Sequence, residues 1–249
     1  MKYKAMLIVL ILFLIGLSAC SDKDSGYRYP LKIGNSWTYL SINTEEISKT
    51  TTIDTIRIVV DSTLTTPHGV SCYRLRIDET WNGNVYTNYQ YLANLNDGLY
   101  SLGICGMGFN IKTGAEQIHA FPLFAAGIKN VKDNDDDIWF DCPHLLFPKH
   151  PEPGYYWVQP ENDDWAEVHY DIHESETVET ELGSFKCYVK HSLVLIDPDD
   201  PYDNYNYYGT YGLIRFYYEY EDDVDDGFGG EAEHRTYTYE VRLIAADLK

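Results

Sequence analysis

The sequence predicts a mainly β protein whose antiparallel strands form one curved sheet, a half-barrel or a sandwich, built from two related halves. Three observations predict this fold class. Apolar and polar residues alternate in several segments, tyrosine occurs 23 times, and short glycine-containing motifs recur later in the chain in the same order. Alternation puts one face of each strand on a core and the other in water, as is typical of antiparallel sheets. Tyrosine suits such a half-buried pleated surface.

Four segments carry the strand prediction along the chain. Residues 51–60 (TTIDTIRIVV) are rich in β-branched side chains, which favour strands. Residues 73–78, 167–173 and 237–243 each alternate apolar with polar side chains. We therefore expect a strand with one buried face at each of these places.

Turn motifs separate the expected strands. Residues 82–84 (Asn-Gly-Asn) and 96–98 (Asn-Asp-Gly) have the chemistry of hairpin turns. Residues 115–128 contain helix-tolerant side chains, but Pro122 interrupts them. The sequence therefore predicts strands joined by turns and no long amphipathic helix.

Three short motifs in the first half of the chain have counterparts in the second half. The paired motifs are residues 34–37 with 154–157, 69–73 with 183–188, and 98–102 with 212–216. Their offsets are nearly constant, at 120 (154 − 34), 115 (187 − 72) and 114 (212 − 98) residues. Motifs repeated in one order at one offset indicate duplicated units. We predict two related β halves, residues 30–140 and 141–249, packed as one compact unit.

Residues 1–19 predict a secretory signal peptide. Lys2 and Lys4 precede an apolar run over residues 5–15, and small residues follow before Cys20, which is the order of parts in such a signal. A membrane-spanning helix needs about 20 apolar residues, so this run is too short to be one.

Residues 17–20 (Leu-Ser-Ala-Cys) resemble the lipobox of bacterial lipoproteins. The resemblance implies cleavage before Cys20, lipidation of Cys20 and attachment to a membrane through that lipid, with residues 20–29 as a lipidated tether. The acidic residues 21–25 (SDKDS) look like the surface-export signal of Bacteroidota lipoproteins. That likeness implies an anchor in the bacterial outer membrane and exposure at the cell surface.

Motifs further along the chain extend the resemblance. Residues 29–39 (YPLKIGNSWTY), 182–187 (LGSFKC) and 208–213 (YGTYGL) look like stretches of uncharacterised bacterial lipoproteins. Some of that group are distantly similar to half-barrel lipoprotein carriers, whose curved antiparallel sheet wraps an apolar cavity. The resemblance implies a lipid or another apolar ligand, but the group has no agreed activity.

Charge and cysteine content narrow the classes of partner and site. The formal net charge is −20, which repels nucleic acid, so we expect no nucleic-acid partner.

Four cysteines remain besides Cys20, and none forms a C-x-x-C pair, so a zinc knuckle or a thioredoxin-type site is unsupported. They are Cys72, Cys105, Cys142 and Cys187. An exported protein can form disulfides, here with three connectivities, and buried free thiols are the alternative.

One expected strand carries four polar side chains on the same face, namely Glu167, His169, Asp171 and His173. Strand geometry spaces neighbours in this row about 6.5–7 Å apart. Two histidines on one face can bind a metal ion if another element supplies a third ligand, which the sequence does not identify. The same pattern is typical of the solvent face of an amphipathic strand. We therefore predict no metal and no cofactor, with His169, Asp171 and His173 as the weak candidates.

A tyrosine-rich segment over residues 202–220 is the second candidate site. We expect the core to take Tyr217 or Tyr218. Aromatic rings beside acids and amides are typical of sugar-binding surfaces. We expect an exposed ligand-binding loop to carry Tyr202, Tyr205, Tyr207 and Tyr208.

The sequence contains no catalytic motif of the G-x-S-x-G, H-E-x-x-H or phosphate-loop type. We therefore predict a non-enzymatic envelope lipoprotein that binds or carries an apolar ligand against the concave face of its sheet. The alternative is a surface module that binds glycans or proteins through the tyrosine-rich loop. A purely structural envelope component is a third interpretation.

Overall fold

The computed structural model describes residues 26–81, 83–105, 138–161, 166–197, 200–224 and 233–249. Within these ranges the chain forms twelve β-strands and no helix. The strands are β1 (Ser36–Glu45), β2 (Thr51–Thr65), β3 (Ser71–Trp81), β4 (Asn84–Asn94), β5 (Gly98–Cys105), β6 (Ile138–Pro148), β7 (Tyr156–Gln159), β8 (Glu167–Thr180), β9 (Gly183–Asp197), β10 (Asp200–Gly209), β11 (Gly212–Val224) and β12 (Glu233–Asp247). Accordingly, no helix that could cross a membrane occurs in the described part of the chain.

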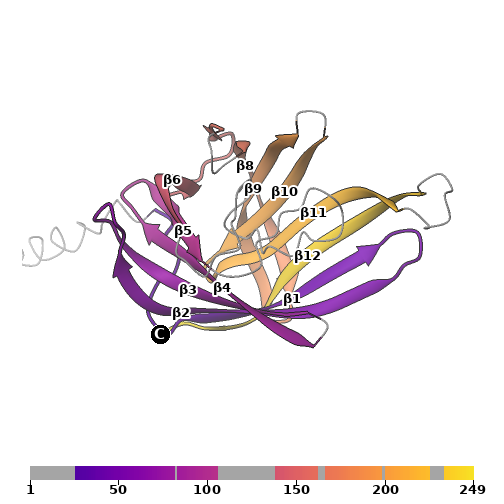
Figure 1. The fold of residues 1–249 in the computed structure, drawn as a ribbon, viewed down its shortest axis with the longest axis horizontal. Coiled ribbons are helices and arrows are strands. Elements are labelled where there is room, and N and C mark those ends of the chain that lie inside the picture. The colour runs from indigo at the N-terminus through magenta and orange to yellow at the C-terminus, as the bar shows by residue number, and fades with distance from the viewer. Residues whose placement is uncertain (1–25, 82, 106–137, 162–165, 198–199, 225–232) are drawn as a thin grey trace, which may run out of the picture.

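All twelve strands belong to one antiparallel sheet, in the order β6-β5-β4-β3-β2-β1-β12-β11-β10-β9-β8-β7. This confirms the predicted antiparallel fold class, and a single continuous sheet selects the curved form over the sandwich. Figure 1 shows the sheet curling so that β6 returns towards β8. The sheet is therefore nearly closed.

The sheet is built from two similar halves. β1–β6 and β7–β12 are each a six-stranded meander in which every strand pairs with the next, and β1 joins β12. The three repeated motifs introduce equivalent strands, first β1 and β7, then β3 and β9, then β5 and β11. Gly34 and Gly154, which open the first pair, have φ angles of 88° and 84°, a conformation that favours glycine. The repeated sequence motifs thus coincide with a repeated structure.

The limits of the halves differ in detail from the predicted ones. β6 crosses the division expected between residues 140 and 141, and the meanders change over between Pro148 and Tyr156. At the N-terminal side, Tyr29 is 1% exposed and the ring of Tyr27 lies 4.9 Å from that of Phe147. These two aromatic residues of the expected tether therefore pack on the domain.

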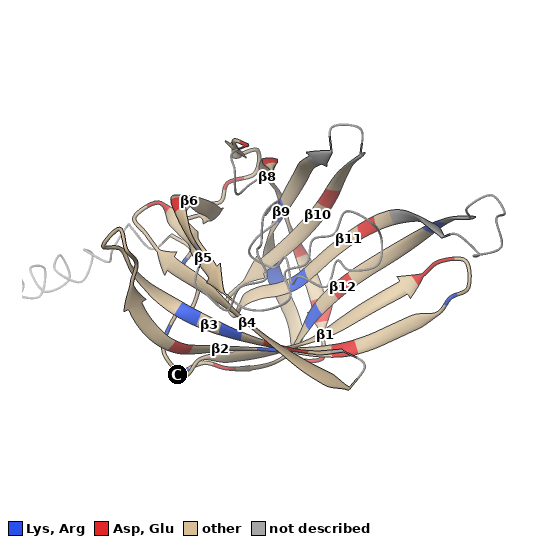
Figure 2. Ribbon diagram, in the orientation of Figure 1, with Lys and Arg blue, Asp and Glu red and all other residues tan. Residues whose placement is uncertain are grey.

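Most of the main core lies on one face of the sheet, which we call the inner face, and a few members, such as Cys187 and Val189, pack on the other face of β9. At the start of β1 the buried Trp37 donates a hydrogen bond from Nε1 to the carbonyl of Tyr211 at 2.6 Å. Tyr39 donates from its hydroxyl to the carbonyl of Leu213 at 3.1 Å. Fully burying a large apolar side chain contributes about 1.5–3 kcal/mol. Charged residues appear along the strands as short separate bands (Figure 2), and buried apolar side chains from many strands form the main core.

Side chains bridge the two ends of the sheet. β6 and β7 are the terminal strands in the sheet order. Trp157 on β7 donates from Nε1 to the carbonyl of Leu145 on β6 at 3.2 Å, and its ring stacks on Tyr170 of β8 at 4.8 Å. His144 of β6 is hydrogen-bonded to the hydroxyl of the same tyrosine at 2.5 Å. The terminal strands of an open sheet are not joined to each other by backbone hydrogen bonds. Here side-chain contacts link β6 to β7 and β8 instead.

Four cysteines lie in the described part of the chain, and none of them forms a disulfide there, namely Cys72, Cys105, Cys142 and Cys187. Cys72 packs in a small apolar cluster with Tyr91 and Leu102, whereas Cys187 belongs to the main core. Burial raises the pKa of Cys72 to about 11 and that of Cys187 to about 12. The two buried cysteines therefore pack as small apolar side chains. For Cys72 and Cys187 the structure thus selects buried thiols over disulfides, the two alternatives that the sequence left open.

Candidate functional sites on β8–β10

The strands β8, β9 and β10 carry polar side chains on both faces. The register places Asp171 opposite His191 on one face and Tyr170 opposite Ser192 on the other. Successive residues of a strand point to opposite faces of the sheet. The sequence neighbours Lys190 and His191 therefore belong to two different sites.

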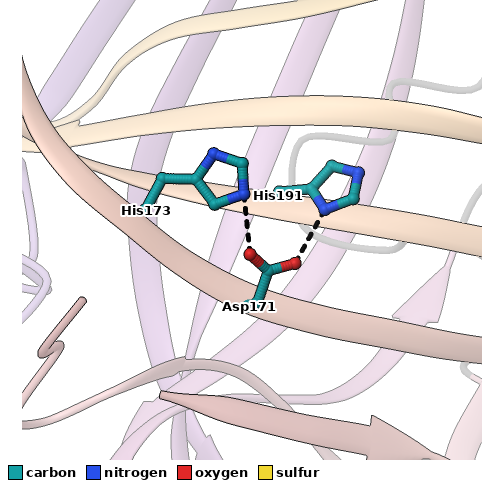
Figure 3. Close-up of side chains that lie close together, drawn as sticks. All are labelled: Asp171, His173 and His191. Atoms are coloured by element: carbon teal, nitrogen blue, oxygen red, sulfur yellow. Dashed lines mark hydrogen bonds and ion pairs between the residues drawn. The ribbon is translucent and has the colours of Figure 1, made fainter. Parts of the chain in front are cut away.

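We call Asp171, His173 and His191 the outer cluster. His173 Nε2 lies 2.7 Å from Asp171 Oδ2, and His191 Nδ1 lies 2.7 Å from Asp171 Oδ1. Figure 3 shows the two imidazole rings directed at the two oxygens of the one carboxylate. One ligand atom from each residue lies within 4.8 Å of the others. The outer cluster is therefore a candidate metal site with two imidazoles and one carboxylate.

His191 has further partners on the side away from Asp171. Its Nε2 is hydrogen-bonded to Asp203 Oδ1 at 2.6 Å, and its ring lies 5.0 Å from the ring of Tyr205. Partial burial lowers the pKa of His191, but the hydrogen bonds to Asp171 and Asp203 outweigh burial and raise it. A carboxylate on the far nitrogen of a ligating histidine fixes the orientation of the ring in metal sites.

An irregular register between β8 and β9 brings His191 into the outer cluster. The register shifts by one residue between His173 and Glu176. A count back from the hairpin turn without this shift pairs Asp171 with Ser192, on the opposite face. Because a shift of one residue exchanges the faces of a strand, the sequence pattern alone could not reveal the third ligand.

The structure places two of the three predicted metal candidates in the outer cluster. Asp171 and His173 lie in the outer cluster, whereas His169 has other partners. His169 Nε2 lies 2.6 Å from Glu167 Oε1, and its Nδ1 lies 2.7 Å from the hydroxyl of Tyr156. Both of its ring nitrogens are engaged, so the outer cluster takes its second histidine from β9 instead.

On the inner face, Lys190 is buried without a carboxylate partner among the described residues. The residue is 3% exposed, and its Nζ lies 4.8 Å from the ring centroid of Tyr170. Burial lowers the pKa of Lys190 to about 7. Buried lysines are rare unless they are paired, so this position calls for an explanation beyond packing.

Two other buried polar groups adjoin Lys190. Ser192 Oγ and Asn204 Nδ2 have no hydrogen-bond partner within the described ranges, and the two residues lie opposite each other in the register. Asn206 donates to Asn204 Oδ1 at 3.3 Å, which occupies the acceptor side of that amide. We call Tyr170, Lys190, Ser192 and Asn204 the inner cluster. Since buried polar groups are usually satisfied, the inner cluster suits a bound group that accepts hydrogen bonds.

His144 completes the surroundings of Tyr170. Burial, with a smaller contribution from the charge of Lys190, lowers the pKa of His144 to about 3. Burial raises the pKa of Tyr170 well above its usual value. Both groups are therefore neutral at pH 7, so Lys190 is the member of this group whose charge changes near neutrality.

The segment with the predicted tyrosine loop is a strand, so the expected loop conformation is wrong, whereas ligand binding by these tyrosines stays a prediction. β10 covers Asp200–Gly209, and strand pairing with β9 and β11 buries Tyr208 completely and leaves Tyr207 8% exposed. Tyr202 is half-buried and packs on an apolar cluster, while the half-buried Tyr205 lies beside His191. The expected core position of Tyr218 is confirmed, since it is 4% exposed.

Two predicted features of the N-terminus fall outside the described residues. These are the lipidation site at Cys20 and the acidic residues 21–25. Both stay predictions.

Comparisons with known proteins return two similar solved structures. The sequence matches no protein-family model and no curated protein. A "putative lipoprotein" from Parabacteroides distasonis is 12% identical, with a TM-score of 0.42 over 90% of this chain and 100% of that chain. A "putative exported protein with YmcC-like fold" from Bacteroides fragilis is 12% identical, with a TM-score of 0.41 over 89% of this chain and 99% of that chain. Similarity at this level carries no argument about function.

Proposed function

We propose that this protein is a lipid-anchored envelope module, not an enzyme, that binds an amphiphile with an anionic head on the inner face of its sheet. The observation that carries the proposal is the inner cluster. Lys190 is 3% exposed and lacks a carboxylate partner among the described residues, and Asn204 Nδ2 and Ser192 Oγ beside it lack hydrogen-bond partners there. Buried groups left in this state cost about 1–3 kcal/mol each, which a bound ligand would offset.

The chemistry of the inner cluster favours an anionic head. Lys190 Nζ, Asn204 Nδ2 and the hydroxyl of Ser192 are all donors, and a carboxylate or phosphate accepts several hydrogen bonds at once. Hydrogen bonds between charged groups are about twice as strong as neutral ones. Tyr170 of the inner cluster packs with the apolar side chains of Val168 and Val194, which would contact a hydrocarbon tail.

The N-terminal motifs support a site of action at the bacterial outer membrane. The lipobox-like residues 17–20 support anchoring through Cys20, and residues 21–25 support exposure at the cell surface. A module anchored in this way acts beside a source of amphiphiles, and the absence of a catalytic motif in the sequence favours binding over turnover.

Native mass spectrometry tests whether the inner face carries a ligand. The protein would be residues 21–249, which contain every described strand, produced in a bacterial periplasm without the lipid anchor. We expect an adduct of lipid mass that is lost on denaturation. A clean ligand-free mass, together with no binding of added palmitate, would contradict the proposal.

A matched pair of ligands tests the role of Lys190. Palmitate and hexadecanol share a tail and differ in the charge of the head. A hydrogen bond to a charged group is worth about 1.5–3 kcal/mol, so Lys190→Met should weaken palmitate binding roughly 10- to 100-fold and leave hexadecanol binding nearly unchanged. Equal losses for both ligands would assign Lys190 a packing role instead.

The glycan-binding alternative has less support. It relied on exposed tyrosines, and two of the four residues, Tyr207 and Tyr208, are buried. A glycan array with the same protein distinguishes the two functions, since specific glycan binding without a lipid adduct would favour the alternative.

A further inference from the structure

The outer cluster is a second site, on the opposite face of the same three strands. It is independent of the amphiphile proposed for the inner face, because its side chains come from positions that alternate with those of the inner cluster. We propose that Asp171, His173 and His191 bind a divalent transition-metal ion of the zinc type, with Asp203 orienting His191.

The donor atoms suit zinc. Zinc is bound by histidine nitrogens and carboxylate oxygens, and a site with three protein ligands leaves a fourth position for water. His173 Nε2 and His191 Nδ1 already converge on the two oxygens of Asp171 at 2.7 Å each. Calcium and magnesium prefer oxygen donors, so two imidazoles favour a transition metal.

The spacing needs only a small adjustment. A tetrahedral ion with donors at about 2.1 Å separates them by about 3.4 Å. The three ligand atoms lie within 4.8 Å of one another, so closing the widest pair takes about 1.4 Å at most by this tetrahedral geometry. The side chain of His173 is 43% exposed, and a half-exposed side chain can make a rotation of this size.

Asp203 provides the hydrogen-bond acceptor that usually orients a metal-bound histidine. Its Oδ1 lies 2.6 Å from His191 Nε2, which is the nitrogen that faces away from the other ligands. An ion at Nδ1 displaces the proton there and leaves the Nε2 proton on the hydrogen bond to Asp203. This carboxylate therefore fixes both the tautomer and the ring orientation of His191.

The test uses the full chain in detergent, stripped of metal with a chelator and titrated with Zn²⁺ against a chromophoric competitor. We expect one ion per chain. His173→Ala and His191→Ala should each weaken binding more than the roughly 10- to 100-fold loss typical of an outer-shell change, which is the loss we expect for Asp203→Asn. Co²⁺ in place of zinc should give a visible absorption spectrum that the two histidine variants lose.

His169→Ala is the matched control. His169 lies two residues from Asp171 on the same face of β8 and is likewise bound to a carboxylate, that of Glu167. This variant should bind zinc like the wild type, and circular dichroism without metal should show that all variants fold. No zinc binding by the wild type, or wild-type binding by the His173 and His191 variants, would overturn the proposal.

Discussion

The two faces of β8–β10 differ in how their polar side chains are paired and buried. On the outer face, His191 lies between Asp171 and Asp203, and hydrogen bonds at 2.7 and 2.6 Å outweigh burial and raise its pKa. On the inner face, its neighbour Lys190 is 3% exposed, and burial lowers its pKa to about 7. One step along a strand therefore separates a paired, partly hydrated group from a buried one without a carboxylate partner among the described residues.

The difference has an energetic consequence. A partly exposed ion pair contributes about 0–1 kcal/mol, so the outer cluster changes the free energy of unfolding little in either direction. An unsatisfied buried group costs about 1–3 kcal/mol. Sites that reduce stability in this way are expected where binding requires them, which is why the inner cluster is the better guide to function.

The largest expected difference between the faces is in the pH dependence of stability, and it comes from a carboxyl group on the inner face. Glu79 is 6% exposed, and burial, with a contribution from the charge of Asp54, raises its pKa from 4.5 to about 7. Between these values the native state binds a proton that the unfolded state has released. The free energy of unfolding should therefore fall as the pH rises from 4.5 to 7, by on the order of 3 kcal/mol. Urea unfolding across this range should show the slope in the wild type and not in Glu79→Gln.

Asp61 provides an outer-face comparison, measured at pH values below its usual pKa of 3.8 rather than between 4.5 and 7. Burial raises the pKa of Asp61, but hydrogen bonds from Arg74 and Ser62 outweigh this and lower it. Its contribution to stability is present above its unfolded-state pKa and is lost as the pH falls, which is the opposite sign. If Asp61→Asn and Glu79→Gln change the pH slope in the same direction, the distinction between the faces is wrong.

Zinc should stabilise the outer face selectively. An ion that binds only the native state adds about 2.7 kcal/mol when its free concentration is 100 times the Kd. Thermal unfolding should therefore shift upward with Zn²⁺ and return with EDTA. His169→Ala should keep the shift and His191→Ala should lose it, whereas a shift that survives in His191→Ala would place the ion elsewhere.

Lys190→Met should make the ligand-free protein more stable. Methionine removes a buried amine that has no carboxylate partner among the described residues, and we expect a gain of about 1–3 kcal/mol at pH 7. The gain should shrink as the pH rises above 7. There the native lysine has lost its proton while the unfolded lysine keeps it, so the wild type gains stability.

Lys186→Met is the comparison for this substitution. Lys186 lies on the same strand but is exposed, so its replacement should change stability by less than about 0.5 kcal/mol. Chemical unfolding of both variants at two pH values measures the difference. A destabilised Lys190→Met would mean that the ammonium group is stabilising in the fold.

The smallest expected effect is the loss of the outer-face carboxylate without metal. Asp171→Asn removes the acceptor for the half-exposed His173 and the more buried His191, and partly exposed pairs contribute about 0–1 kcal/mol. We therefore expect a change below about 1 kcal/mol in EDTA, measured by urea unfolding. A much larger loss of stability would show that the outer cluster stabilises the fold even without a metal ion.

The sequence alone determined the antiparallel strands and the hairpin turns between them. Alternation in residues 167–173 and 237–243 predicted β8 and β12, and the motifs at Gly34 and Gly154 predicted equivalent strands. These signals are local, because a strand reports its buried face through every second residue. The tyrosines of β10 were misplaced, since acids and amides between aromatic rings resemble a loop until pairing with β9 and β11 buries the rings.

Only the tertiary structure decided which side chains meet. The third member of the outer cluster, His191, reaches Asp171 through a one-residue shift in the β8–β9 register. His144 reaches Tyr170 only because the sheet curls until β6 meets β8. Lys190 is buried on the face that its register position assigns to it, although its sequence context suggests no core position. Local patterns fix the period of a strand, but register and curvature depend on contacts between distant strands, and those contacts create both sites.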